Sequence, residues 1–260
     1  MTTEFATSSD GTRIAFERNG IGPVLVLVDG ATCYRAFGPA KPFTDELASE
    51  FTVVSYDRRG RGESGDSSTY DAKLEFDDLR AVLTALGEPA YVLGFSSGAA
   101  LAYRAAAAGV PMRKLIGYEA PWVGLRGGRD YISDLDGLIA AGQNSKAVDY
   151  FMVKMVAAPF FVPIMMRLMG KVWKQLLQVA PTLRYDARVM GGDFAAPTAE
   201  LARVTVPTLV VWGSKAAEEM VAGNQQIVAA IPGAGHRILN GQTHNVLPSA
   251  LHPALTEFFA

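Results

Sequence analysis

The chain has little cysteine, little net charge and no long uninterrupted apolar run. Its 260 residues include one cysteine, Cys33, which excludes an intramolecular disulfide. The 24 basic and 26 acidic residues give a net charge of −2, so neither nucleic acid nor an anionic membrane is an expected partner. The first residues lack the basic and apolar regions of a secretory signal. We therefore expect a cytoplasmic protein that acts on a small molecule, and the sequence leaves its oligomeric state open.

The most apolar stretch runs from Met155 to Met169. Pro159, Pro163 and Arg167 interrupt it, and it is too short to span a bilayer. Because 49% of the residues are hydrophobic, the chain can bury a large core. We expect the apolar stretch to belong to a packed domain or to a ligand pocket.

Apolar, β-branched runs alternate with helical patterns along the first 118 residues. Alternation around Asp10-Gly11 predicts a β-hairpin over residues 4–18. Strand and helix alternation predicts a largely parallel sheet, because parallel strands need crossover connections. The expected strands cover 24–28, 51–56, 91–93, 114–118, 208–212 and 236–239, and the expected helices cover 41–50, 71–86, 99–108, 218–230 and 248–259.

Residues 120–205 break this alternation, and their pattern predicts a helical insertion. Helical segments are expected near 130–141, 145–157, 163–169 and 171–180, with Gly or Pro between them. Six of the nine methionines lie here, with aromatic residues, and they suit either the core of the insertion or an adaptable apolar pocket. These residues are Met152, Met155, Met165, Met166, Met169, Met190, Phe151, Phe160, Phe161, Trp173 and Trp122, of which Trp122 is the expected substrate contact.

The run Gly94-Phe95-Ser96-Ser97-Gly98 has the G-x-S-x-G pattern of a nucleophile elbow. A serine on a sharp strand-to-helix turn needs small residues two positions away on either side, because a Cβ there would collide with backbone. The helix that follows would point unpaired N–H groups at charge developing on the serine. A tight structural turn is the alternative, but the strand before and the small-residue helix after favour Ser96 as a nucleophile.

Three further motifs make the chain resemble the α/β-hydrolase superfamily over essentially its whole length. Residues 57–64 read D-R-R-G-R-G-E-S, whose charged side chains we interpret as structural; residues 208–213 match the seventh strand, and 241–244 match the histidine loop. The resemblance implies an α/β-hydrolase fold, with a mostly parallel central sheet flanked by helices. It also implies a core at 1–119 and 206–260 and a helical lid at 120–205, inserted after the sixth strand. No cofactor is implied.

The resemblance implies a catalytic triad with Ser96 as nucleophile and His244 as general base. His244 follows the last strand in a Gly-containing loop, where the family's base lies, unlike His236 and His252. An exposed loop histidine without a catalytic role is the alternative interpretation of His244.

The acid of the triad is left open by the sequence. Similar enzymes usually carry Asp shortly after the seventh strand, where this chain has Ala216. Some place the acid after the sixth strand, where Glu119 lies, and this position keeps the Ser, acid, His order. Glu119 is the preferred acid, Glu218 or Glu219 is the alternative, and a dyad without an acid is the third possibility.

The turn at residues 29–33 also departs from the family, because Asp29 replaces the usual histidine of a His-Gly turn. The backbone N–H groups of Ala31 and Ser97 are the expected oxyanion donors, since that role depends on main chain. Asp29 is expected to cap its own loop by an Asx-type bond, and the alternative is that it orients a polar substrate group. Cys33 is either a pocket residue or a small buried hydrophobe.

The expected function is hydrolysis of an ester, lactone or thioester of a small apolar molecule through an acyl-Ser96 intermediate. Two rival functions remain. The resemblance also covers non-hydrolytic enzymes that cleave C–C bonds or act as lyases or cyclases, which the Asp29 substitution would suit. The second rival is a ligand-binding protein with little turnover.

Overall fold

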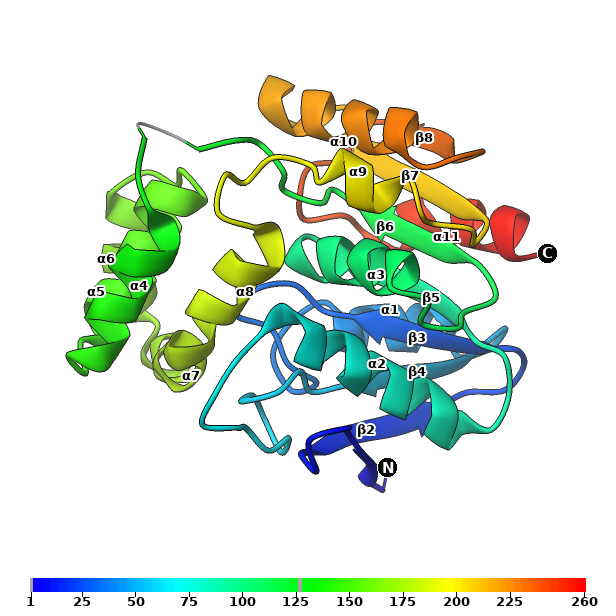
Figure 1. The fold of residues 1–260 in the computed structure, drawn as a ribbon, viewed down its shortest axis with the longest axis horizontal. Coiled ribbons are helices and arrows are strands. Elements are labelled where there is room, and N and C mark those ends of the chain that lie inside the picture. Colours follow the sequence, from blue (N-terminus) through cyan, green and yellow to red (C-terminus); the bar gives the residue numbers. More distant parts are fainter. Residues whose placement is uncertain (1, 126–127) are drawn as a thin grey trace.

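The computed structural model describes residues 2–125 and 128–260 and contains an eight-stranded sheet (Figure 1). Met1 and residues 126–127 of the predicted insertion lie outside the described part. The strand order is β1-β2-β4-β3-β5-β6-β7-β8; β2 pairs antiparallel with β1 and β4, and the remaining neighbours pair in parallel. The strands are β1 (Glu4–Thr7), β2 (Arg13–Asn19), β3 (Val24–Val28), β4 (Thr52–Tyr56), β5 (Tyr91–Phe95), β6 (Leu115–Tyr118), β7 (Thr208–Gly213) and β8 (Gly235–Leu239).

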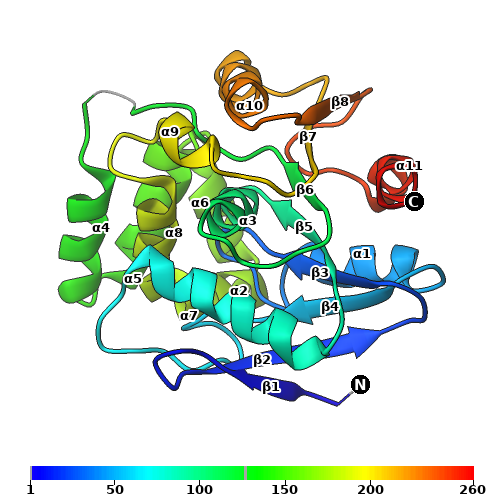
Figure 2. The same ribbon diagram turned by 45° about the vertical axis from the view of Figure 1, so that its right-hand side comes forward.

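Helices cover both faces of this sheet, which confirms the predicted mostly parallel, helix-flanked architecture. Figure 2 shows α2, α3 and α10 on one face and α1 with α11 on the other. These helices are α1 (Ala40–Leu47), α2 (Ala72–Leu86), α3 (Ser97–Ala107), α10 (Glu218–Ala230) and α11 (Pro248–Phe259). The ends of α2 follow its sequence signals, because Asp71 caps the first turn through the N–H of Lys73 and Gly87 ends the helix at φ 75°.

The sheet separates two hydrophobic cores. In β3, Val24, Val26 and Val28 belong to the core beneath α2 and α3, whereas Leu25 and Leu27 face α1 and α11. Every residue of β3 is therefore buried, as a strand covered on both faces requires. The parallel strands β3, β5, β6 and β7 all end at one edge of the sheet, so the loops that follow them meet there.

The helices between β6 and β7 lie beyond that edge. In Figure 1, α4 to α7 are the part of the molecule farthest from the sheet, and α8 packs between α4 and α3. The elements are α4 (Tyr131–Ala140), α5 (Asn144–Tyr150), a π-helical turn (Phe151–Met155), α6 (Phe161–Leu168), α7 (Gly170–Val179), a 3-10 turn (Ala180–Thr182), α8 (Leu183–Met190) and α9 (Thr198–Leu201). That they form a separate lid domain stays a prediction. Within the described residues, no helix combines the length and apolar character needed to cross a bilayer.

The insertion differs from the sequence-based expectation in two ways. Helices α8 and α9 were not expected. The eight residues of α8 alternate apolar with charged side chains and α9 has four residues, so neither gives a long periodic signal. The expectation that the apolar stretch from Met155 to Met169 is packed is wrong for α6, where Ile164 and Leu168 are exposed. This helix buries Pro163 and packs Met166 against the core, but most of its other large apolar side chains face solvent.

Candidate active site

Ser96 lies on the sharp turn between β5 and α3. Its backbone has φ 53° and ψ −126°, a strained conformation that costs about 1–3 kcal/mol. A Cβ on Gly94 would lie 2.6 Å from Cα of Ala99, and a Cβ on Gly98 would lie 2.2 Å from the carbonyl oxygen of Val28. The turn therefore requires glycine at both positions, and it holds Ser96 at the carboxyl edge of the sheet.

Glu119 and His244 form a hydrogen-bonded pair at the same edge. Nδ1 of His244 lies 2.8 Å from Oε2 of Glu119, and Oε1 of Glu119 accepts the backbone N–H of Gly213 at 2.9 Å. Glu119 follows β6 directly and is 1% exposed, while His244 lies in the loop between β8 and α11. The carboxylate is thus held on two sides, and it orients the imidazole ring through Nδ1.

The other carboxylates considered for the acid role lie elsewhere. Glu218 and Glu219 are exposed residues in the first turn of α10, and in the described part of the chain neither bonds to His244. Ala216 borders the same cavity as Glu119 and His244 without supplying a carboxylate. Of the three glutamates, Glu119 is the one beside the ring.

Ser96 and His244 both line a cavity of about 370 Å³. Within residues 2–125 and 128–260, Ser96 Oγ makes no direct hydrogen bond to His244. Hydrogen bonds between a nucleophile and its base are often long without ligand and tighten in the substrate complex. The cavity therefore brings the two groups to one site.

The remaining histidines have other partners. His236 stacks on Trp212 with ring centroids 5.4 Å apart. His252 lies with Nδ1 3.1 Å from Glu46 and Nε2 3.1 Å from Glu50. Neither imidazole lines the cavity, whose described lining contains His244 alone of the three.

Ala31 and Ser97, the expected oxyanion donors, line the cavity beside Ser96. Ser97 is the first residue of α3, so its N–H has no acceptor within the helix. The positive end of the α3 dipole lies at the same place. These positions suit stabilisation of negative charge next to Ser96.

Asp29 lies at the end of β3 and is 2% exposed. In the described part of the chain its Oδ1 has no hydrogen-bond partner, so the expected Asx-type cap does not form through that atom. Burial raises the pKa of this carboxyl to about 7, and the charges of Arg61 and Arg58 oppose that rise. Asp29 is absent from the cavity lining, which departs from its expected place beside the substrate.

Asp29→Asn is expected to stabilise the protein more at pH 8 than at pH 5. The pKa of Asp29 is about 7 in the folded protein and about 3.9 in the unfolded chain. The resulting contribution to stability is fully present below about pH 3.9 and is lost as the pH rises to about 7. The neutral amide avoids that loss. Urea unfolding should show a variant-minus-wild-type difference about 2.5 kcal/mol larger at pH 8. Asp45→Asn, an exposed control, should show no such change, and equal differences at both pH values would contradict burial of a titrating carboxyl.

Two other expected pocket residues also lie away from the cavity. Burial raises the pKa of the Cys33 thiol to about 12, which leaves it protonated at neutral pH. Trp122 is 2% exposed, and its Nε1 donates to the carbonyl oxygen of Met190 at 2.9 Å. Neither residue is among the described lining residues; Trp122 packs in the core and Cys33 is half-buried.

The cavity wall above Ser96 comes mainly from apolar side chains of the insertion. Phe151, Met155 and Met190 line it, whereas Phe160 and Phe161 are exposed and Met152 packs against the core. Sequence reasoning missed several lining residues because they stand in loops or short turns without a periodic signal. These residues are Pro121, Val123, Val156, Phe194, Lys215 and Thr243. Tyr131, the first residue of α4, also lines the cavity. Within the described residues, no cluster of three or more His, Cys, Asp or Glu is placed to hold a metal ion.

Asp186 of α8 also lines the cavity, and sequence reasoning missed it. Its carboxylate accepts hydrogen bonds from Arg58 at 2.7 Å, from Arg61 at 2.5 Å and from Ser97 Oγ at 2.8 Å. Burial opposes its ionisation, but Arg61 and Arg58 outweigh this and hold its pKa below the ordinary value. Arg58 and Arg61 are thus structural, and Asp186 ties the insertion to the turn beside Ser96.

Asp186→Ala is expected to lower the free energy of unfolding by about 3–5 kcal/mol, because it leaves two buried guanidinium groups without their shared partner. Asp136→Ala is the matched control. Asp136 of α4 pairs with Arg188 of α8, but both side chains are about a third exposed, so loss of Asp136 should cost less than about 1 kcal/mol. Urea unfolding of both variants measures the difference, and equal losses would contradict the role of Asp186.

The comparisons with known proteins agree with this architecture. A model described as the alpha/beta hydrolase family matches residues 20–250. The crystal structure of an alpha/beta hydrolase from Sphaerobacter thermophilus DSM 20745 is 42% identical, with a TM-score of 0.89 over 99% of this chain and 100% of that one. A hydrolase from Pseudomonas aeruginosa PA01, 24% identical, has a TM-score of 0.73 over 100% and 98% of the two chains, which shows a shared fold.

A curated relative adds a shorter match. The uncharacterized hydrolase YraK of Bacillus subtilis (strain 168) is 36% identical over 98 residues, which are 35% of this chain and 34% of that protein. The match thus spans about a third of that relative. The family model, by contrast, covers most of the chain and includes Ser96, Glu119 and His244. The chain therefore belongs to the alpha/beta hydrolase family.

Proposed function

We propose that this hydrolase cleaves an ester, lactone or thioester of a small apolar molecule through an acyl-serine intermediate. The observation that carries the proposal is the Glu119–His244 pair, joined at 2.8 Å, in the same cavity as the strained Ser96 turn. A serine alone is a weak nucleophile, and a base oriented by a carboxylate is what activates it. Family membership and the hydrolase-named relatives support the broader class of reaction.

In the proposed reaction, Ser96 Oγ attacks the substrate carbonyl carbon while Nε2 of His244 takes the hydroxyl proton. The carbonyl oxygen becomes an oxyanion, which the N–H groups of Ala31 and Ser97 stabilise. His244 then gives its proton to the leaving alcohol or thiol, and the C–O or C–S bond breaks. Water attacks the acyl-Ser96 ester with His244 as base, and the acid is released as the serine is regenerated. Glu119 holds the Nδ1–H tautomer throughout.

The size and the lining of the cavity suit a substrate with a compact apolar acyl group. At about 370 Å³ it lies near the lower end of ordinary small-molecule sites. Phe151, Met155, Met190 and Phe194 supply apolar surface on the insertion side. Two carboxylates of the lining are already paired, Glu119 with His244 and Asp186 with arginines, so neither is available to hold a cation.

Turnover of chromogenic short-acyl esters by the wild-type protein tests the proposal. The expected result is steady release of the chromophore, preceded by a burst of about one equivalent where deacylation is slower than acylation. Tight binding of the ester without turnover would contradict the proposal and favour a ligand-binding protein. Neither binding nor turnover across a series of esters, lactones and thioesters would instead favour non-hydrolytic chemistry.

A further inference from the structure

Helix α6 presents an apolar stripe to solvent. Phe161, Ile164, Met165 and Leu168 recur at the i, i+3, i+4, i+7 spacing of one helix face, and each is more than half exposed. An amphipathic helix of a globular protein normally turns such a stripe to the core. The described chain has twelve exposed large hydrophobic residues, and seven of them lie within residues 156–169. We call these seven the apolar patch: Val156, Phe160, Phe161, Ile164, Met165, Leu168 and Met169.

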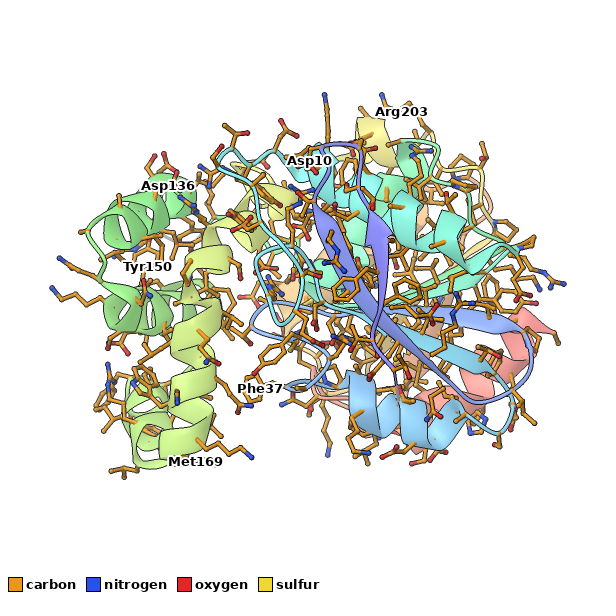
Figure 3. All side chains as sticks on the ribbon, turned by 90° about the horizontal axis from the view of Figure 1, so that it is seen from below. Asp10, Phe37, Asp136, Tyr150, Met169 and Arg203 are labelled. Carbon is orange, nitrogen blue, oxygen red and sulfur yellow. The ribbon has the colours of Figure 1, made fainter. Side chains whose placement is uncertain are left out.

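Met169 of the apolar patch lies at one end of the helical insertion (Figure 3). Val156 belongs to the apolar patch and also lines the cavity that contains Ser96. The apolar patch therefore adjoins the cavity of the candidate active site at Val156.

Positive charge accompanies the apolar patch. No Asp or Glu occurs between Asp149 and Asp186, whereas this segment contains five basic residues. Arg167 pairs with Asp149, but Lys154, Lys171 and Lys174 are exposed and, within the described chain, belong to no ion pair. The net charge of −2 for the whole chain thus conceals a local excess of positive charge.

We propose that the apolar patch and its lysines bind the surface of an anionic lipid aggregate. Exposed aromatic and aliphatic side chains flanked by lysines form the surface of an interfacial helix, whose apolar side enters the boundary between headgroups and acyl chains. The lysines then meet the negative surface potential of anionic lipids. The net charge of the whole chain gives no expectation of binding to an anionic membrane, whereas this proposal rests on the charge of one segment of the chain.

Charge also argues against a second copy as the occupant. A two-fold dimer through this face would bring the same patch together from both subunits. The exposed lysines of both subunits would then lie at one interface, and like charges across an interface are unfavourable. An anionic surface removes this repulsion and replaces it with attraction.

Flotation with phospholipid vesicles tests the proposal on the full chain. The vesicles contain phosphatidylcholine alone or with about 30 mol% phosphatidylglycerol. The wild-type protein is expected to float with the anionic vesicles and to be released by added salt, because salt screens the lysines. Lys171→Gln combined with Lys174→Gln should lower partitioning by about fivefold for each charge removed. Leu168→Ser should lower it by at least about fivefold through lost apolar insertion.

Matched controls separate this effect from loss of fold. Ile21→Ser removes an apolar side chain that is 74% exposed in the loop between β2 and β3, and Lys73→Gln removes an exposed lysine of α2. Both should float like wild type, and all variants should keep their melting temperature. Because the readout is binding, failure of the proposed hydrolysis would leave this result unaffected.

Three outcomes would overturn the proposal. One is equal flotation with neutral and anionic vesicles, or none with either. Another is wild-type partitioning by the Lys171→Gln, Lys174→Gln double variant. The third is a stable dimer in sedimentation that Leu168→Ser dissociates, since a second copy would then cover the apolar patch.

Discussion

Ser96→Ala is expected to lower ester turnover by about 10⁵- to 10⁶-fold, because it removes the atom that forms the acyl intermediate. The cavity, Glu119 and His244 remain, so the residual rate is that of water in a site that still binds the substrate. Steady-state kinetics on one chromogenic ester measure the loss, and the melting temperature checks the fold.

Ser97→Ala is the matched neighbour of this change. It removes the hydroxyl that donates to Asp186 but keeps the backbone N–H expected to face the oxyanion. It should therefore reduce stability and cost far less turnover than Ser96→Ala. A reversed order, with Ser97→Ala inactive and Ser96→Ala active, would move the nucleophile by one residue.

Glu119→Gln is expected to lower turnover by up to about 10⁴-fold, by analogy with the same acid-to-amide change in serine proteases. The N–H of Gly213 needs an acceptor, so the amide oxygen takes the place of Oε1 and the NH₂ group faces Nδ1 of His244. Nδ1 of His244 must then accept a hydrogen bond from that NH₂ group. The proton moves to Nε2, which loses its ability to take a proton from Ser96.

Glu218→Gln and Glu219→Gln are the controls for Glu119→Gln, and they should be nearly silent because both side chains are exposed. The three variants are compared on one ester with their melting temperatures. If Glu119→Gln keeps full activity and either control loses its activity, the acid of the triad would lie at the start of α10. Full activity in all three would leave a Ser96–His244 dyad.

The sequence predicts the parts of the site that rest on local steric rules. Gly94 and Gly98 indicate the turn around Ser96, because the backbone approaches at both positions leave no room for a Cβ. Glu119 is the preferred acid because the resemblance implies that some members carry the acid after the sixth strand, and the sequence leaves Glu218, Glu219 and a dyad open. Buried strands such as β3 are equally predictable from continuous apolar runs.

Other features depend on long-range contacts that a single sequence does not reveal. Asp186 lies 125 residues beyond Arg61 in the chain, on a helix too short to show a periodic pattern. The burial of Asp29 likewise follows from how the loops pack. The apolar spacing of α6 predicts a helix correctly, but the same pattern fits a face turned to the core or to solvent, so only the tertiary structure distinguishes them.

Covalent labelling with a fluorophosphonate tests the central claim most directly, because only an activated serine reacts readily with this probe. Intact-mass spectrometry followed by peptide mapping is expected to find one adduct per chain, on Ser96, and none in Ser96→Ala. Labelling that survives in Ser96→Ala, or that maps to Ser97, would contradict the account.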